Sequence, residues 1–278
     1  MDAPGQTAEA DKARRAASFG AVASAYATHR PDYPVAAIQW ALEPALALAG
    51  RPAARPIEVT DLGAGTGKLT AQLASLTTGS RGVRVVAVEP DPDMLAELRR
   101  RLPGVTAVAG RAEAIPLPDA CADAVLSGQA MHWFDLDRAM PEIARVLRPG
   151  GAVAGLWNAD DDRVDWVAGV YRASGRHNVA AYSSFEEGPD TGLSGWISTA
   201  GRTLFWPAEH AGFEHAQVRT AQSLVETFRT HSMYLIMDPA AREAVLAGVR
   251  DYLAATPQTA AGEFRWPMYT LAVRAVRR

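Results

Sequence analysis

The sequence predicts an α/β fold built on a mostly parallel β-sheet, and three observations lead to this prediction. From residue 57 onward, short apolar runs alternate with segments of helical periodicity, which is typical of successive strand–helix–strand units. Runs such as residues 85–88 contain only valine and alanine, as expected of strands covered by helices on both faces. A glycine-rich stretch at residues 63–67 follows the first run, where such folds place a ligand-binding turn.

The elements follow one another along the chain. Residues 1–18 lack apolar periodicity and are predicted to be a flexible tail, and aromatic anchors follow before the first strand. Pro149-Gly150-Gly151 is expected to end a helix and turn the chain into the next strand. The predicted strands are 57–62, 83–88, 105–109, 124–127 and 152–156, and the predicted helices between them are 68–76, 92–101 and 137–147.

The regular alternation stops after residue 158. Residues 159–205 are rich in aromatic residues and glycine, and we predict an inserted substrate cap there, because long segments inside compact domains are usually functional. A capping-box pattern at residues 223–226 and the pair Asp238-Pro239 predict two helices, the second over 239–254. Residues 216–220 and 264–276 predict an antiparallel edge of the sheet. The predicted division is a tail at 1–18, a ligand-binding core at 19–158, the cap at 159–205 and a C-terminal completion of the core at 206–278.

Composition argues against several classes of function. The formal net charge is -3 and there is no basic block, so neither nucleic acid nor an anionic membrane is an expected partner. No apolar run approaches the length of about 20 residues that spans a bilayer, and the first residues do not form a signal peptide, so we expect a cytoplasmic protein. Cys121 is the only cysteine, and no metal is expected. The aspartates at 160–162 and 165 are interpreted as a solvated loop and a helix start rather than as a magnesium site.

The strongest functional signal is the stretch from Asp61 to Gly67. Glycines there let the backbone approach a ligand closely, and the following helix presents free N–H groups. A dinucleotide fingerprint has its third glycine three residues after the second, whereas here Gly67 comes two residues after Gly65, so NAD is the weaker interpretation. Glu89 ends the next strand, where a carboxylate can accept hydrogen bonds from both hydroxyls of a ribose. The alternative for Glu89 is an ordinary strand-end glutamate.

Four successive stretches, residues 61–68, 88–95, 110–119 and 132–151, resemble in order and spacing the motifs of class I S-adenosylmethionine-dependent methyltransferases. The likeness covers about residues 19–157 and is greatest to the methyltransferase type 11 family, in its trans-aconitate methyltransferase-like branch. It implies a Rossmann-like sheet, S-adenosylmethionine as cofactor and a small-molecule substrate. Methylation of a hydroxyl or carboxyl oxygen is favoured. N- or C-methylation, an NAD-linked dehydrogenase and a non-catalytic nucleotide-binding module are the alternatives.

The resemblance also implies roles for individual residues. The glycine turn passes beneath the methionine part of the cofactor, Glu89 binds the ribose, and Pro90 and Met94 flank the adenine. Arg30 lies in a segment that folds over the cofactor in this branch and is expected to pair with the methionine carboxylate; the alternative is a surface arginine beside a proline turn. The residues implied to bind the cofactor are Tyr26, Arg30, Asp61, Gly63, Ala64, Gly65, Gly67, Glu89, Pro90, Met94, Ala112, Glu113, Gln129 and His132.

On the acceptor side, His132 is the candidate catalytic base, because an imidazole there can take a proton from a hydroxyl. The alternative for His132 is a hydrogen-bonded structural residue. We expect direct in-line displacement of the methyl group, with the protein supplying alignment and exclusion of water, and we expect the cap to set acceptor choice. The predicted substrate contacts are Trp133, Trp157, Asn158, Trp166 and Tyr171.

Overall fold

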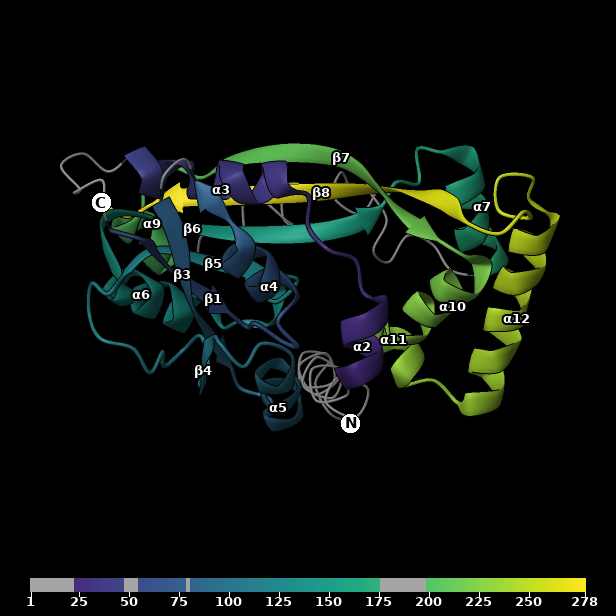
Figure 1. Ribbon diagram of the computed structural model, residues 1–278, viewed down its shortest axis with the longest axis horizontal. Helices are drawn as coiled ribbons and strands as arrows, with labels where there is room; N and C mark the ends of the chain where they lie inside the picture. The colour runs from purple at the N-terminus through teal and green to yellow at the C-terminus, as the bar shows by residue number, and fades with distance from the viewer. Residues whose placement is uncertain (1–22, 48–54, 79–80, 176–198) are drawn as a thin grey trace. The chain divides into compact units, whose positions relative to one another are not determined.

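The computed structural model describes residues 23–47, 55–78, 81–175 and 199–278. It contains one sheet in the order β2-β3-β1-β5-β6-β8-β7, with β4 paired to β3, and Figure 1 shows the strands side by side. The α/β prediction is confirmed. The predicted tail and residues 176–198 of the predicted cap lie outside the described residues. The strands are β1 Ile57–Leu62, β2 Thr77–Thr78, β3 Arg81–Glu89, β4 Thr106–Ala109, β5 Ala122–Gly128, β6 Leu147–Asp160, β7 Glu209–Arg219 and β8 Phe264–Val276.

Within the described ranges, helices lie where the sequence predicts them. None of them is both long and apolar enough to cross a membrane. They are α2 Ala23–His29, α3 Val35–Ala47, α4 Lys68–Ser75, α5 Pro92–Arg101, the 3-10 turn η2 Met131–Trp133, α6 Leu136–Val146, α7 Asp165–Ala173, α9 Thr199–Leu204, α10 Ala221–Arg229, α11 Ser232–Leu235 and α12 Pro239–Ala255. Of these, α2, α3, α9 and α11 were not predicted from the sequence.

The central strands run parallel and in register. β1 pairs with β3 on one side, where Leu62 lies opposite Val88, and with β5 on the other, where Asp61 lies opposite Leu126. β4 is parallel to β3, and β6 is parallel to β5. The carboxyl ends of β1, β3 and β5 therefore reach the same edge of the sheet, which is where open α/β folds bind ligands.

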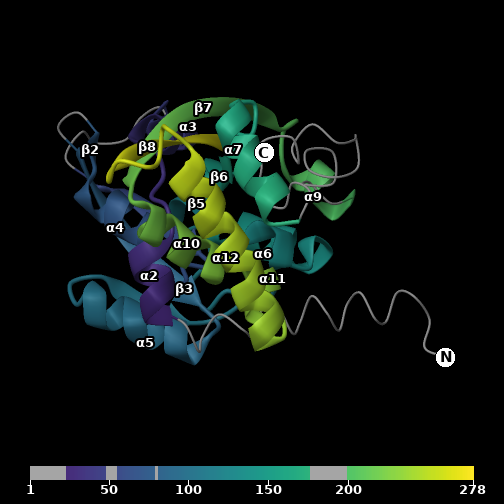
Figure 2. The same cartoon turned by 90° about the vertical axis from the view of Figure 1, so that its right-hand side faces the viewer.

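The chain divides into two compact units. Among the described residues, the sheet unit comprises 32–47, 55–78, 81–158, 199–213 and 270–278, and the helical unit comprises 23–31, 159–175 and 214–269. In the helical unit α10 packs against α2 and α12, and α12 packs against α7, as can be followed in Figure 2. Each unit has its own buried apolar cluster. The predicted division into core, cap and C-terminal completion stays a prediction.

Local signals located two helices correctly. α5 begins at Pro92 after the N-cap Asp91, and α12 begins at Pro239 after the N-cap Asp238. The carboxylate of Asp238 accepts hydrogen bonds from the backbone N–H groups of Ala240 and Ala241. Because a cap is satisfied by backbone groups two or three residues away, it can be recognised from sequence alone.

Three boundary predictions are wrong. Pro149-Gly150-Gly151 lies within β6 rather than in a turn before it, because Gly150 and Gly151 exchange backbone hydrogen bonds with Arg277 beyond β8. The capping box of α10 is formed by Thr220 and Ser223 rather than by residues 223 and 226. β7 starts at residue 209, seven residues earlier than the edge strand predicted at 216.

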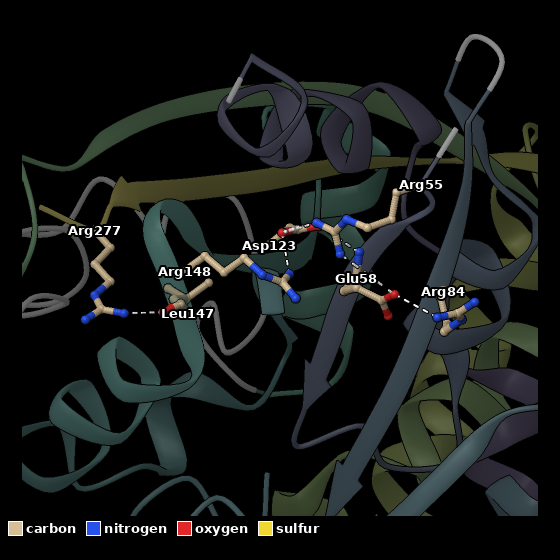
Figure 3. Close-up of polar contacts among 7 residues, drawn as sticks. All are labelled: Arg55, Glu58, Arg84, Asp123, Leu147, Arg148 and Arg277. Carbon is tan, nitrogen blue, oxygen red and sulfur yellow. Dashed lines mark hydrogen bonds and ion pairs between the residues drawn. The ribbon is translucent and has the colours of Figure 1, made fainter. Parts of the chain in front are cut away.

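A buried carboxylate joins the amino ends of three strands. Asp123 is fully buried and accepts two hydrogen bonds from Arg55, at 3.0 and 2.9 Å, and one from Arg148 at 2.6 Å. The backbone N–H of Glu58 donates to the same carboxylate at 3.0 Å, and Arg84 pairs with the Glu58 side chain at 2.8 Å (Figure 3). The starts of β1, β5 and β6 are thereby tied together at the amino edge.

We expect Asp123→Ala to lower the free energy of unfolding by about 2 to 3 kcal/mol, because the charge-assisted hydrogen bonds of a buried carboxylate are lost. Urea denaturation measures this change. Glu43→Ala is the matched control, because Glu43 pairs with Arg274 at 2.8 Å while its side chain is 59% exposed, and such pairs contribute at most about 1 kcal/mol. Equal losses in the two variants would contradict the role given to Asp123.

Candidate functional site

The glycine turn between β1 and α4 is held in a left-handed backbone conformation. Gly63, Gly65 and Gly67 have φ angles of 71°, 56° and 85°, which favour glycine. A Cβ atom added at Gly63 would lie 2.6 Å from the Cβ of Ala130, whereas one added at Gly65 would have no atom of the described residues within 4 Å. The turn is therefore closed toward β5 at Gly63 and open at Gly65, where a ligand can approach the backbone.

Glu89 lies beside this turn at the carboxyl end of β3. Its side chain accepts hydrogen bonds from the backbone N–H groups of Gly65 at 2.8 Å and Asp91 at 2.9 Å. Burial raises the pKa of this carboxyl above its usual value. Each carboxylate oxygen has a second lone pair, so Glu89 is oriented by the backbone and can still accept from the hydroxyls of a ligand.

Asp61 is fully buried at the end of β1. The Thr70 hydroxyl donates to its Oδ2 atom at 2.5 Å, but Oδ1 has no hydrogen-bond partner in the part of the chain that the structure describes. Burial, and next to it the charge of Glu89, raise the pKa of Asp61 to about 7. The Thr66 and Ser127 hydroxyl oxygens are likewise buried without a partner among the described residues. This edge therefore holds several polar atoms that a ligand with hydrogen-bond donors would satisfy.

The residues expected around the adenine differ in their surroundings. Met94 on α5 and Ala112 after β4 are buried, and Pro90 is exposed. One carboxylate oxygen of Glu113 is already engaged, because its Oε1 atom accepts a hydrogen bond from the backbone N–H of Asp135 at 2.8 Å. Glu113 therefore links the segment after β4 to the start of α6.

The predicted acceptor residues of the sheet unit do come together. Gln129 follows β5, and its Nε2 atom donates to the backbone oxygen of Asn158 on β6 at 2.7 Å. The indole N–H of Trp157 points toward Nδ1 of His132 at 3.4 Å, and the rings of His132 and Trp133 have centroids 4.7 Å apart. Aromatic and amide side chains thus lie at the carboxyl ends of β5 and β6.

Asn158 is buried, and both ends of its side-chain amide have protein partners. Its Nδ2 atom donates to the backbone oxygen of Asp32 at 3.1 Å, and its Oδ1 atom accepts from the Thr270 hydroxyl at 2.5 Å. Asn158 therefore serves to position its neighbours in this structure. The predicted substrate contact by Asn158 stays a prediction.

The segment that includes Asp32 and Tyr33, which the family resemblance predicts to fold over the cofactor, contacts α4 directly after the glycine turn. Asp32 forms an ion pair with Lys68, with 3.1 Å between Oδ1 and Nζ. The next residue, Tyr33, exchanges two backbone hydrogen bonds with the Gln72 side chain, at 2.9 and 2.5 Å. The position of Lys68 directly after the glycine turn could be seen in the sequence. Its ion-pair partner Asp32 could not be predicted, because it lies 36 residues away and no local pattern connects the two.

Trp166, Tyr171 and Arg30 belong to the helical unit. The Tyr171 hydroxyl donates to Asp160 at 2.6 Å, and Trp166 packs edge-on against Trp266 with ring centroids 5.3 Å apart. Burial raises the pKa values of Asp160 and Tyr171. Trp166 and Tyr171 thus contribute to the core of the helical unit.

The remaining predictions in this unit have mixed outcomes. Arg30 donates to the backbone oxygen of Thr230 at 3.1 Å, and the side chain of Tyr26 lies outside the description. The expected solvated loop is wrong for Asp160 and Asp161, which are buried, because Trp266 and Arg163 respectively donate to them.

The fold and this edge together define a class of protein. A parallel sheet with antiparallel last strands carries a left-handed glycine turn after β1 and a carboxylate at the end of β3. Residues 60–155 match the family described as a methyltransferase domain. The protein is a class I S-adenosylmethionine-dependent methyltransferase.

The chain belongs to the methyltransferase family over nearly its full length. It is 40% identical over 260 residues to an uncharacterized methyltransferase of Mycobacterium tuberculosis, covering 93% of this chain and 95% of the relative. A malonyl-[acyl-carrier protein] O-methyltransferase of Enterobacter lignolyticus is 34% identical over 186 residues, 66% of this chain and 69% of the relative. A solved structure from Anaeromyxobacter dehalogenans, assigned as a type II methyltransferase, has a TM-score of 0.60 and 28% identity, covering 89% of this chain and 97% of that one. The trans-aconitate methyltransferase-like branch stays a prediction.

The raised pKa of Asp61 predicts a pH-dependent stability of the ligand-free protein. Between pH 4 and 7 the unfolded carboxyl loses its proton while the folded one keeps it, so this group makes the free energy of unfolding fall as the pH rises. We expect wild type to lose about 4 kcal/mol relative to Asp61→Asn across this range.

Urea denaturation at several pH values measures this difference. Asp137→Asn, at an exposed position in the first turn of α6, should keep the pH slope of wild type. Parallel stability curves for wild type and Asp61→Asn would show that the buried carboxyl does not titrate in this range.

Proposed function

We propose that the protein methylates an oxygen of a small molecule, a hydroxyl or a carboxyl, by in-line displacement that releases S-adenosylhomocysteine. The observation that carries this proposal is Glu89, fixed beside the open face of the glycine turn by the Gly65 N–H. The O-methyltransferase name of the Enterobacter relative favours oxygen over nitrogen or carbon. The net charge of -3 supports a small substrate rather than a nucleic acid.

The residues at this edge fit S-adenosylmethionine. Glu89 would accept from the two ribose hydroxyls, and the open face at Gly65 leaves room for the methionine part to pass close to the backbone. The partnerless oxygen of Asp61 would accept a hydrogen bond from the cofactor's ammonium group, and a positive charge there favours the ionised carboxylate. When bound, the cofactor supplies an electrophilic methyl group.

The protein's own contribution is alignment and shelter. Trp133 and Trp157, both half-buried, would form apolar walls for the acceptor beside the site. The indole N–H of Trp157 points toward Nδ1 of His132, so this nitrogen already has a donor within the protein. We therefore favour a role for His132 in orienting the acceptor over the role of general base, and we retain acceptor choice by the cap as a hypothesis.

The cofactor assignment is tested by Glu89→Gln. We expect its affinity for S-adenosylhomocysteine to fall about ten- to hundredfold, because a hydrogen bond to a charged group contributes about 1.5 to 3 kcal/mol. Isothermal titration calorimetry measures it, with NAD as the comparison ligand. Glu43→Gln, on the exposed side of α3, should bind like wild type. An unchanged affinity in a folded Glu89→Gln protein would remove the ribose assignment.

A further inference from the structure

Gln129 adopts a backbone conformation that its residue type disfavours. Its φ angle is 55°, and Ala120 is the only other non-glycine residue with positive φ in the part of the chain that the structure describes. Its backbone N–H is held by the backbone oxygen of Leu156 at 2.9 Å. Left-handed conformations at residues with a side chain cost about 1 kcal/mol or more and occur preferentially at functional sites. The presence of glutamine here is therefore best explained by its side chain.

The hydrogen bonds of Gln129 fix which way its amide faces. Nε2 donates to the backbone oxygen of Asn158 at 2.7 Å. A carbonyl oxygen can only accept, so the nitrogen of the amide and not its oxygen must face Asn158. The Oε1 atom is then directed elsewhere. Within the described ranges Oε1 has no hydrogen-bond partner, and it is accessible to solvent.

The partner of Gln129 is itself rigidly held. Asn158 is 5% exposed, and its side chain is bound by Thr270 at one end and by the backbone of Asp32 at the other. The backbone oxygen that orients Gln129 thus belongs to a residue with little freedom to move. Gln129 therefore presents a pre-oriented acceptor atom at low entropic cost.

The position of Gln129 connects this acceptor atom with the cofactor edge. A Cβ atom added at Gly63 would lie 2.6 Å from the Cβ of Ala130, the residue that directly follows Gln129. On its other side Gln129 reaches β6, where Trp157 contacts His132. Gln129 thus lies, along the chain and along β6, next to residues of the proposed cofactor turn and of the proposed acceptor side.

We propose that Gln129 Oε1 accepts a hydrogen bond from the nucleophilic group of the substrate, so that the atom to be methylated carries an O–H or N–H. A neutral carbonyl oxygen attracts such a group and repels a carboxylate, which has only lone pairs to offer. The hydrogen bond turns the proton toward Gln129 and leaves a lone pair free to face the methyl carbon. The inference rests on the proposed function and narrows the acceptor oxygen from that of a hydroxyl or a carboxyl to that of a hydroxyl.

The atoms of the step balance without a further reactant. The substrate oxygen forms a bond to the methyl carbon as the bond between this carbon and sulfur breaks, and the electron pair of that bond stays on sulfur. The proton of the hydroxyl then passes to solvent water, because an amide oxygen is too weak a base to keep it. Gln129 is a substrate-orienting residue in this scheme and not a base.

Sinefungin tests this inference without knowledge of the substrate. It resembles S-adenosylhomocysteine but carries a protonated amine at the place of the transferable methyl group, and so presents N–H donors where the substrate must approach. We expect wild type to bind sinefungin more tightly than S-adenosylhomocysteine. Gln129→Leu should reduce this preference at least tenfold, with the Kd of S-adenosylhomocysteine within about twofold of wild type, because a hydrogen bond to a charged group is lost.

Gln129→Asn provides the matched control for folding. Asparagine tolerates left-handed backbone better than most residues, but its amide is one methylene shorter, so this variant should fold at least as well and also lose the preference. If Gln129→Leu lost affinity equally for sinefungin and S-adenosylhomocysteine, Gln129 would contact the methionine part that both ligands share. If the preference for sinefungin were unchanged, Gln129 would not contact the amine of sinefungin. Either result overturns the inference. Failure of wild type to bind S-adenosylhomocysteine would instead overturn the proposed function.

Discussion

The pairing of β1 with β3 on one side and with β5 on the other is the constraint on which the site depends. Both pairings are parallel and continue to the carboxyl end of β1. They bring Asp61, Glu89 and the residues after β5 to one edge, although these are separated by up to 68 positions in the sequence. Parallel strands covered on both faces leave only their ends for polar chemistry, so the site can form only at such an edge.

The two edges of this sheet differ in how their polar groups are satisfied. At the amino edge, the buried Asp123 is bound by two arginines and a backbone N–H. At the carboxyl edge, Asp61 has one partnerless oxygen and a pKa raised to about 7. A buried polar atom left unsatisfied costs stability, and this cost is recovered when a ligand supplies the missing donor. The amino edge therefore contributes to stability, and the carboxyl edge retains binding capacity.

Sequence reasoning succeeded where the determining contacts are local. The caps Asp91 and Asp238 bind backbone groups within three residues, and the glycine turn is recognised because its conformation itself requires glycine. It failed where a partner is distant. Pro149-Gly150-Gly151 was predicted to be a turn because its partner Arg277 lies far along the chain, and nothing near Tyr171 indicates that its hydroxyl donates to Asp160. Aromatic composition alone cannot distinguish a core from a ligand cavity.

The same distinction explains why Gln129 was predicted to belong to the site but not what it does there. Its place after a predicted strand was enough to locate it at the ligand edge. Its orientation depends on the backbone oxygen of Asn158, and the side chain of Asn158 is bound by Thr270, more than 100 residues later in the chain. A side-chain amide offers one donor and one acceptor end, and only the partner decides which end faces the ligand. The specificity that we propose for this edge would therefore depend on a contact of β8, far from every motif that identifies the cofactor.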